Sequence, residues 1–334
     1  MPVLYDGFNN IININDIYTS VLSFGASGDG VTDDTAAIQA ALDSLKDTGG
    51  TIYFPVGTYK LTASVYFYSN QYLLFEKGAK LLQGADINNL MMNYSTADIG
   101  GYDATENAVI DGAIFDGSNF TTDITMLGIC HSKNITIKNC QFINCFGYWH
   151  QIEVNSSKNV LIDGCYFEGE RKTASSGEMI QIDSFVNIYT WPWGNGASDN
   201  TISYMVEVKN CHFENSANVP AIGNHSSETA VNCIRIHDNI FEGLSSDRGV
   251  INFQSAKNVD VYNNTFVDCN TGVTIGTADG TNAVYNNRFI GINSVGSGIN
   301  SFFNMINGSL KSTSGVVETS QLDELSSLLE GEVE

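Results

Sequence analysis

One short pattern, a small polar residue three positions ahead of a phenylalanine, returns six times between Asn139 and Phe289. The phenylalanines follow one another at steps of 25, 46, 28, 25 and 23 residues. A fixed repeat of this length is typical of a solenoid, and the step of 46 indicates one coil with an insertion of about 20 residues. The six phenylalanines are Phe142, Phe167, Phe213, Phe241, Phe266 and Phe289.

Short runs of alternating apolar residues stand just ahead of the repeats, as in Ile135–Ile137, Val160–Ile162 and Val259–Val261. Alternation with a period of two predicts β-strands. Strands stacked in register from successive coils form a parallel β-helix, which buries the inward residues of each coil against its neighbours. We therefore expect an all-β chain, a single-stranded parallel β-helix over about residues 50–308 in which the phenylalanines stack.

The two ends of the chain differ from the coils. Residues 1–20 have no period and are expected to form an arm or a cap, followed by the β-helix domain over residues 21–308. Apolar residues at helical spacing predict a short helix near residues 34–46 that covers the first coil. Residues 309–334 form an acidic tail with a short amphipathic helix, which would cap its own chain, meet other copies or stay disordered.

Charge and composition restrict the classes of partner. The formal net charge of −22 excludes nucleic acid, whose binding needs Lys and Arg to neutralise phosphates. The sequence contains no run of 18 apolar residues, so we expect no membrane insertion, and we see no signal peptide pattern. Cys140, Cys165 and Cys211 occupy the same place in successive coils, which predicts an inward stack of free thiols. Cysteine and histidine spacings indicate neither a metal nor another cofactor.

The segment FGASGDGVTDDTAAIQAAL, followed by GGTIYFPVGTYKL, resembles the opening segment of the pectate lyase superfamily. That superfamily includes polygalacturonase-like enzymes and phage tailspike depolymerases. The resemblance covers roughly residues 21–61 and implies a right-handed parallel β-helix that acts on a carbohydrate. It also implies an extracellular protein or a component of a phage virion tail, and, because tailspikes are commonly trimers, a homotrimer.

Alignment of the coils places several polar residues on one outward strip, which we expect to be exposed. Glu153 and Gln181 fall in one outward row, and Asn155, Asp183 and His225 fall in the next. The backbones of Glu153 and Asp183 are expected about 8 Å apart, which leaves their carboxyl groups compatible with retaining or inverting glycosidases. His225 would tune one carboxylate or bind a sugar hydroxyl. The alternative is a solvated polar sheet face without a function.

Aromatic residues gather at the same edge of the predicted sheet. Trp149 and His150 precede the strand of Glu153, and Trp191 and Trp193 lie in the long insertion after Asp183. Sugar rings stack on exposed aromatic faces, so these residues are candidates for substrate binding; packing of the insertion on the solenoid is the alternative. Arg171 is a candidate contact for a carboxylate or phosphate of a substrate, or simply a residue of a solvated turn.

These observations favour an endo-acting glycan hydrolase in which Glu153 and Asp183 share the acid and base, or nucleophile, roles and His225 assists. A polysaccharide lyase is the first alternative, and it would need a cation to neutralise a uronic acid. A glycan-binding receptor or structural spike without catalysis is the second.

Overall fold

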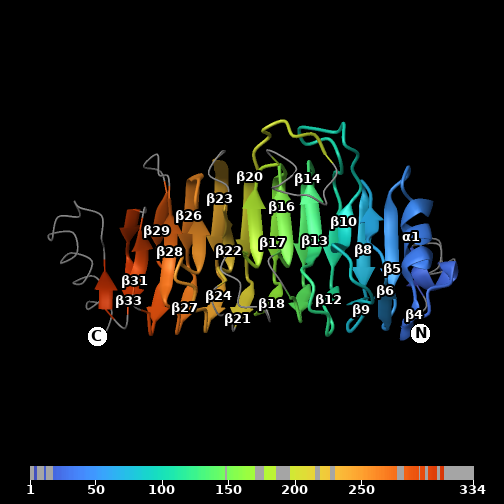
Figure 1. Cartoon of the computed structure of the whole chain (residues 1–334), viewed down its shortest axis with the longest axis horizontal. Coiled ribbons are helices and arrows are strands. Elements are labelled where there is room, and N and C mark those ends of the chain that lie inside the picture. Colours follow the sequence, from blue (N-terminus) through green and yellow to red (C-terminus); the bar gives the residue numbers. More distant parts are fainter. Residues whose placement is uncertain are drawn as a thin grey trace.

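The structure is a computed structural model of the whole chain, and it confirms the predicted right-handed parallel β-helix (Figure 1). Beyond the short antiparallel pair β1 (Leu4–Tyr5) and β2 (Ile11–Ile12), the structure describes residues 18–146, 149–169, 177–185, 196–214, 219–225, 230–276, 282–292, 294–297, 300–306 and 309–311. No helix among these residues is both long enough and apolar enough to cross a membrane.

Three long sheets run along the axis of the solenoid, and each coil contributes one strand to each of them. The site sheet, named for the candidate site described below, consists of β7 (Val65–Phe67), β10 (Asn89–Asn93), β13 (Thr125–Cys130), β16 (Ile152–Asn155), β19 (Ile180–Asp183), β22 (Ile222–Asn224), β25 (Ile251–Phe253), β28 (Thr271–Ile275) and β31 (Ser294–Ser297).

The second sheet consists of β3 (Thr19–Ser20), β5 (Gly50–Phe54), β8 (Gln71–Phe75), β11 (Val109–Asp111), β14 (Lys133–Lys138), β17 (Lys158–Asp163), β20 (Tyr204–Lys209), β23 (Val231–His237), β26 (Ala256–Tyr262), β29 (Ala283–Tyr285) and β32 (Asn300–Phe302). The third sheet consists of β4 (Asp29–Asp33), β6 (Thr58–Leu61), β9 (Lys80–Gln83), β12 (Ile114–Asp116), β15 (Gln141–Ile143), β18 (Tyr166–Glu168), β21 (His212–Glu214), β24 (Ile240–Glu242), β27 (Thr265–Val267), β30 (Arg288–Ile290), β33 (Asn304–Ile306) and β34 (Ser309–Lys311). Neighbours pair in parallel except β33 and β34, which close the third sheet as an antiparallel pair.

The six predicted phenylalanines form one continuous inward stack. Ring centroids of Phe167 and Phe213 are 4.5 Å apart, and those of Phe213 and Phe241 are 4.9 Å apart, with nearly parallel planes. All six side chains are fully buried. The strands β18 and β21 are direct neighbours although 46 residues separate Phe167 from Phe213, so the extra residues belong to a single coil, as predicted.

A second inward column lies next to the phenylalanines and changes its chemistry along the axis. Cys140, Cys165 and Cys211 are buried free thiols, as predicted. The column continues as buried asparagines in a hydrogen-bonded ladder, in which the backbone N–H of Asn264 donates to Oδ1 of Asn287 at 2.9 Å. The ladder comprises Asn239, Asn264, Asn287 and Asn304.

The predicted N-terminal helix is present as α1 (Thr35–Ser44), preceded by the 3-10 helix η2 (Val21–Phe24). Its apolar residues Ile38, Ala41 and Leu42 are fully buried in the main core, and α1 lies at the N-terminal end of the solenoid in Figure 1. It therefore covers the first coil. The predicted C-terminal amphipathic helix lies outside the described residues.

The stack makes a direct prediction about stability. Phe213→Ala should lower the free energy of unfolding by about 3–5 kcal/mol, because it leaves a cavity between the rings of Phe167 and Phe241, which the paired strands hold apart. Ile240→Ala, on an adjacent coil but with a side chain 46% exposed, should change it by less than about 1 kcal/mol. Urea denaturation followed by circular dichroism checks both; equal losses in the two variants would contradict the role of the stack.

Candidate functional site

The predicted alignment of coils on the site sheet is confirmed. Ile152 of β16 pairs with Ile180 of β19, Glu153 is beside Gln181, and Asn155 is beside Asp183. β22 then pairs with β19, and His225 follows β22 directly. Because alternate residues of a strand face opposite sides, the isoleucines enter the core while the polar residues share the outer face.

The predicted exposure of this strip is wrong for four of its five members. Glu153 is 4% exposed, and Asn155, Gln181 and Asp183 are fully buried, whereas the side chain of His225 is 38% exposed. The chain folds back over the sheet after β19, where Phe185 packs on the outward residues Met92 and Cys130. The strip is therefore a covered polar site that meets solvent at His225.

Glu153 lies in an environment that favours a neutral carboxylic acid. Its two oxygens accept hydrogen bonds from Thr125 Oγ1 at 3.2 Å and Asn155 Nδ2 at 2.8 Å. Burial raises the pKa of Glu153 to about 8, and the charge of Asp183 adds to this shift while the two hydrogen bonds and His225 oppose it. At neutral pH this carboxyl group holds a proton that it can donate.

Asp183 lies in a different environment, although it is only one coil away. Its carboxylate accepts hydrogen bonds from Gln181 Nε2 at 3.1 Å and from the backbone N–H of Ser184 at 2.8 Å. Hydrogen bonds donated to a carboxylate stabilise its charged form. The same Gln181 nitrogen lies 3.3 Å from His225 Nε2, so Gln181 connects the carboxylate to the imidazole.

His225 is held from its other side by Glu178, which the sequence did not single out. His225 Nδ1 lies 3.0 Å from Glu178 Oε2, and Arg248 Nη1 donates to Glu178 Oε1 at 3.0 Å. Burial lowers the pKa of His225, but its hydrogen bond to Glu178 and the charges of Glu178 and Asp183 outweigh this and raise the pKa above its usual 6.5.

His150 borders the same carboxylate but is itself 4% exposed. Its Nδ1 lies 2.7 Å from the backbone oxygen of Glu178, and its ring stacks on that of His225 at 5.8 Å. Burial lowers the pKa of His150 to about 4 against the opposing charge of Glu178. It is thus a neutral imidazole at physiological pH.

Unpartnered polar atoms concentrate at this site. Ten buried side-chain nitrogen or oxygen atoms of the described residues lack a hydrogen-bond partner, and five of them belong to the coils of β16, β19 and β25. Buried polar atoms are normally paired, so such a cluster marks a place where water or a polar ligand completes the hydrogen bonding. The five atoms are Gln151 Oε1, Asn155 Oδ1, Gln181 Oε1, Ser184 Oγ and Arg248 Nε.

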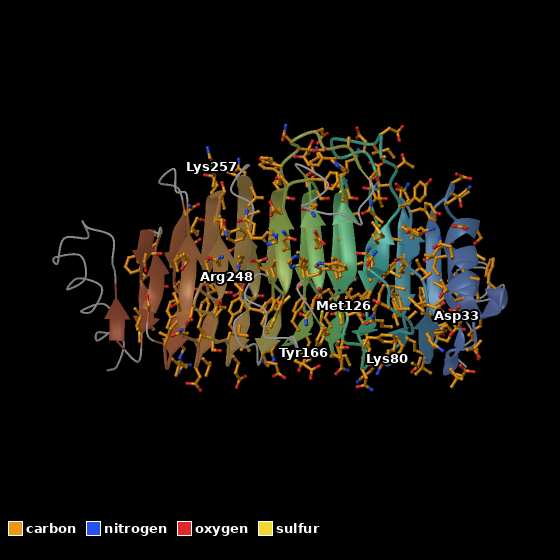
Figure 2. The ribbon with its side chains drawn as sticks, in the orientation of Figure 1. Asp33, Lys80, Met126, Tyr166, Arg248 and Lys257 are labelled. Atoms are coloured by element: carbon orange, nitrogen blue, oxygen red, sulfur yellow. The ribbon has the colours of Figure 1, made fainter. Side chains whose placement is uncertain are left out.

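A polar groove of about 490 Å³ continues the site toward the C-terminal coils. Arg248 belongs to both the groove and the candidate site, because its side chain lines the groove and also pairs with Glu178. In Figure 2, Arg248 and Met126 are labelled near the middle of the view, with the coils of the site between them. The groove is lined by Asp247, Arg248, Asn252, Gln254, Thr271, Thr274, Ser294, Gly296 and Ser297.

The structure brings together Glu153, Asn155, Gln181, Asp183 and His225, with His150 beside them. Trp149 is partly buried next to His150, and the three remaining candidates, Arg171, Trp191 and Trp193, lie outside the described residues.

Sequence reasoning missed Glu178 and Arg248. Extending the alignment of β16 with β19 by two residues places Glu178 opposite His150, so a longer alignment would have found it. Arg248 reaches the site from a turn, which no strand register predicts.

Two curated proteins are similar to this chain over part of their length. Plasmin and fibronectin-binding protein A of Streptococcus pneumoniae is 31% identical over 69% of this chain and 36% of its own length. Glucan 1,3-beta-glucosidase of Cochliobolus carbonum is 25% identical over 55% of this chain and 28% of its own length. The chain thus spans about a third of the length of these curated relatives.

Solved structures show the same architecture. The crystal structure of PfbA, a surface adhesin of Streptococcus pneumoniae, superposes with a TM-score of 0.71 at 23% identity, covering 89% of this chain and 80% of the other. The tailspike protein of Escherichia coli bacteriophage HK620, in complex with a pentasaccharide, gives 0.59 at 13% identity over 90% and 64%. The sequence model of one family, described as rhamnogalacturonase A/epimerase, pectate lyase-like, matches residues 18–218. With more than half of its length matched, the chain belongs to the pectate lyase-like family of rhamnogalacturonase A and epimerases.

Proposed function

We propose that the chain is an endo-acting glycan hydrolase that uses Glu153 as the general acid and Asp183 as the general base or nucleophile. The observation that carries this proposal is the difference between the two carboxyl environments. Both groups are buried, but the pKa of Glu153 is raised to about 8 and one of its two donors is a hydroxyl, while both donors to Asp183 are N–H groups. Glycoside hydrolysis uses one carboxyl group that holds a proton and a neighbouring one that is ionised, and this difference supports giving those two roles to Glu153 and Asp183.

The proposed reaction assigns a step to each group. Glu153 donates its proton to the oxygen of the scissile glycosidic bond, and Asp183 either activates a water molecule or attacks the anomeric carbon. Gln181 and Asn155 offer unpartnered amide oxygens to sugar hydroxyls, and the groove beyond Arg248 holds further sugar units. Burial of the pair strengthens its electrostatic effect on the reacting bond.

Two alternatives predict different products. A lyase needs a cation to neutralise a uronate carboxylate, and the guanidinium of Arg248 at the site is already paired with Glu178. A binding-only protein would share the groove without turnover, as the adhesin among the relatives suggests. Incubation with candidate glycans separates the three: new reducing ends alone indicate hydrolysis, unsaturated products absorbing in the ultraviolet indicate a lyase, and bound but intact glycan indicates a receptor.

Glu153→Gln and Asp183→Asn should each lower the rate of glycan cleavage by at least about a hundredfold. Both replacements keep the shape of the side chain, so the folded structure should persist. Glu242→Gln is the matched control, because its carboxylate is 54% exposed on the third sheet. Full activity in either site variant, with wild-type circular dichroism, would remove that residue from the mechanism.

The acid assignment also predicts a pH dependence that needs no substrate. The carboxyl group of Glu153 ionises near 4.5 in the unfolded chain and near 8 in the folded one, so the folded chain binds more protons between these values. The stabilisation is fully present below about pH 4.5 and is lost as pH rises through about 8. The free energy of unfolding of wild type, relative to E153Q, should therefore fall over this range, as measured by urea denaturation at several pH values. A difference that stays constant from pH 5 to 8 would contradict a neutral Glu153.

The similarity to a surface adhesin and a phage tailspike supports an extracellular or phage-borne location. The homotrimer that the family resemblance implies is part of the same proposal. One chain has a mass of 36.2 kDa, so light scattering on the purified protein should give about three times that value. A mass near that of one chain would show that the trimer is wrong.

A further inference from the structure

A cluster of metal-binding side chains lies beside the carboxylate pair. His150, Glu178 and His225 come from three successive coils, and one ligand atom from each lies within 4.8 Å of the other two. We propose that these three residues bind a divalent transition metal ion of the zinc class. This inference does not rest on the proposed hydrolysis, because its readout is metal binding and needs no substrate.

The donor set favours this class of ion. Two imidazoles and one carboxylate are the protein ligands of many three-ligand zinc sites, whereas Ca²⁺ and Mg²⁺ prefer oxygen atoms. His225 Nδ1 and His150 Nδ1 lie 3.0 Å and 4.0 Å from Glu178 Oε2. Zn²⁺ bound at about 2.0–2.2 Å in tetrahedral geometry needs donor atoms about 3.3 Å apart. To bind the ion, His150 Nδ1 would exchange its 2.7 Å contact with the backbone oxygen of Glu178 for the metal.

The surroundings of Glu178 supply the second shell that metal ligands normally have. Its carboxylate is completely buried, and Arg248 binds Oε1, which fixes the side chain and leaves Oε2 turned toward the two imidazoles. The Arg248 Nη2 group also donates to the backbone oxygen of Gly177 at 2.7 Å, so the guanidinium itself is anchored. Outer contacts of this kind orient a ligating carboxylate.

The cluster also has a route for the ion and an open coordination position. The side chain of His225 is 38% exposed while His150 and Glu178 are buried, so the ion would enter from the side of His225. Three protein ligands leave one position for water or for a sugar hydroxyl, as in catalytic zinc sites. Sequence spacing does not indicate this site, since the ligands are 28 and 47 residues apart and meet only through the coil register.

The test is direct titration of the tag-free full chain with Zn²⁺ after treatment with EDTA. Isothermal titration calorimetry should give one saturable site per chain, and Zn²⁺ should raise the midpoint of thermal unfolding. His225→Ala, at a partly exposed position that a folded chain tolerates, should weaken binding at least about tenfold and abolish the shift in the midpoint. Glu178→Gln should do the same, with circular dichroism confirming its fold.

His212→Ala is the matched control. His212 belongs to a separate group with Glu214 and Glu242 on the third sheet, whose ligand atoms are equally close but partly exposed. Zn²⁺ binding that persists in His212→Ala and is lost in His225→Ala supports the proposal. Absence of a saturable site, or loss of binding in His212→Ala with retention in His225→Ala, would overturn it.

Discussion

The parallel pairing of coils in strict register is the constraint on which the rest of this structure depends. Each strand of the site sheet, such as β16, hydrogen-bonds to the strand before and the strand after it, so a residue is placed directly above its equivalent in the next coil. Inside the solenoid this spacing produces stacks of like side chains, because a phenylalanine or an asparagine then meets its own kind. A slip of one residue would turn every stack outward, so the core and the site are specified together.

The same register that stacks apolar residues inside concentrates polar residues outside. Glu153, Gln181 and Asp183 come close together because their strands are neighbours, although 30 residues separate the first from the last. On a solvated sheet such residues would be ordinary, but here they are buried. Burial raises the pKa of Glu153, so the site owes its chemistry to its cover as much as to the strands.

Much of this arrangement was predictable from the sequence, because the repeat fixes the register. The phenylalanine positions define the coils, and alignment of the coils with one another predicts Glu153 beside Gln181 and Asn155 beside Asp183, as in the structure. The repeat does not predict the contacts made by residues that lie outside the strands. Phe185 packs on Met92 and Cys130 from beyond the end of β19, and Glu178, the partner of His225, is held by Arg248, which reaches it from a turn. Turns obey no period, so their contacts follow only from the folded chain.

The inward asparagine ladder has a consequence for the length of the solenoid. Each side-chain amide in it accepts from the backbone N–H of the preceding coil and donates to carbonyl groups, as Asn287 does to Val261 and Tyr285. All the amides therefore point the same way, and each coil presents to the next the surface that it received from the one before. A column of this kind has no internal end, so coils can be duplicated or lost within it without creating an unmatched junction. The number of coils in the C-terminal half of this chain can therefore change, and with it the length of the solenoid beyond the site, without a change in the site itself.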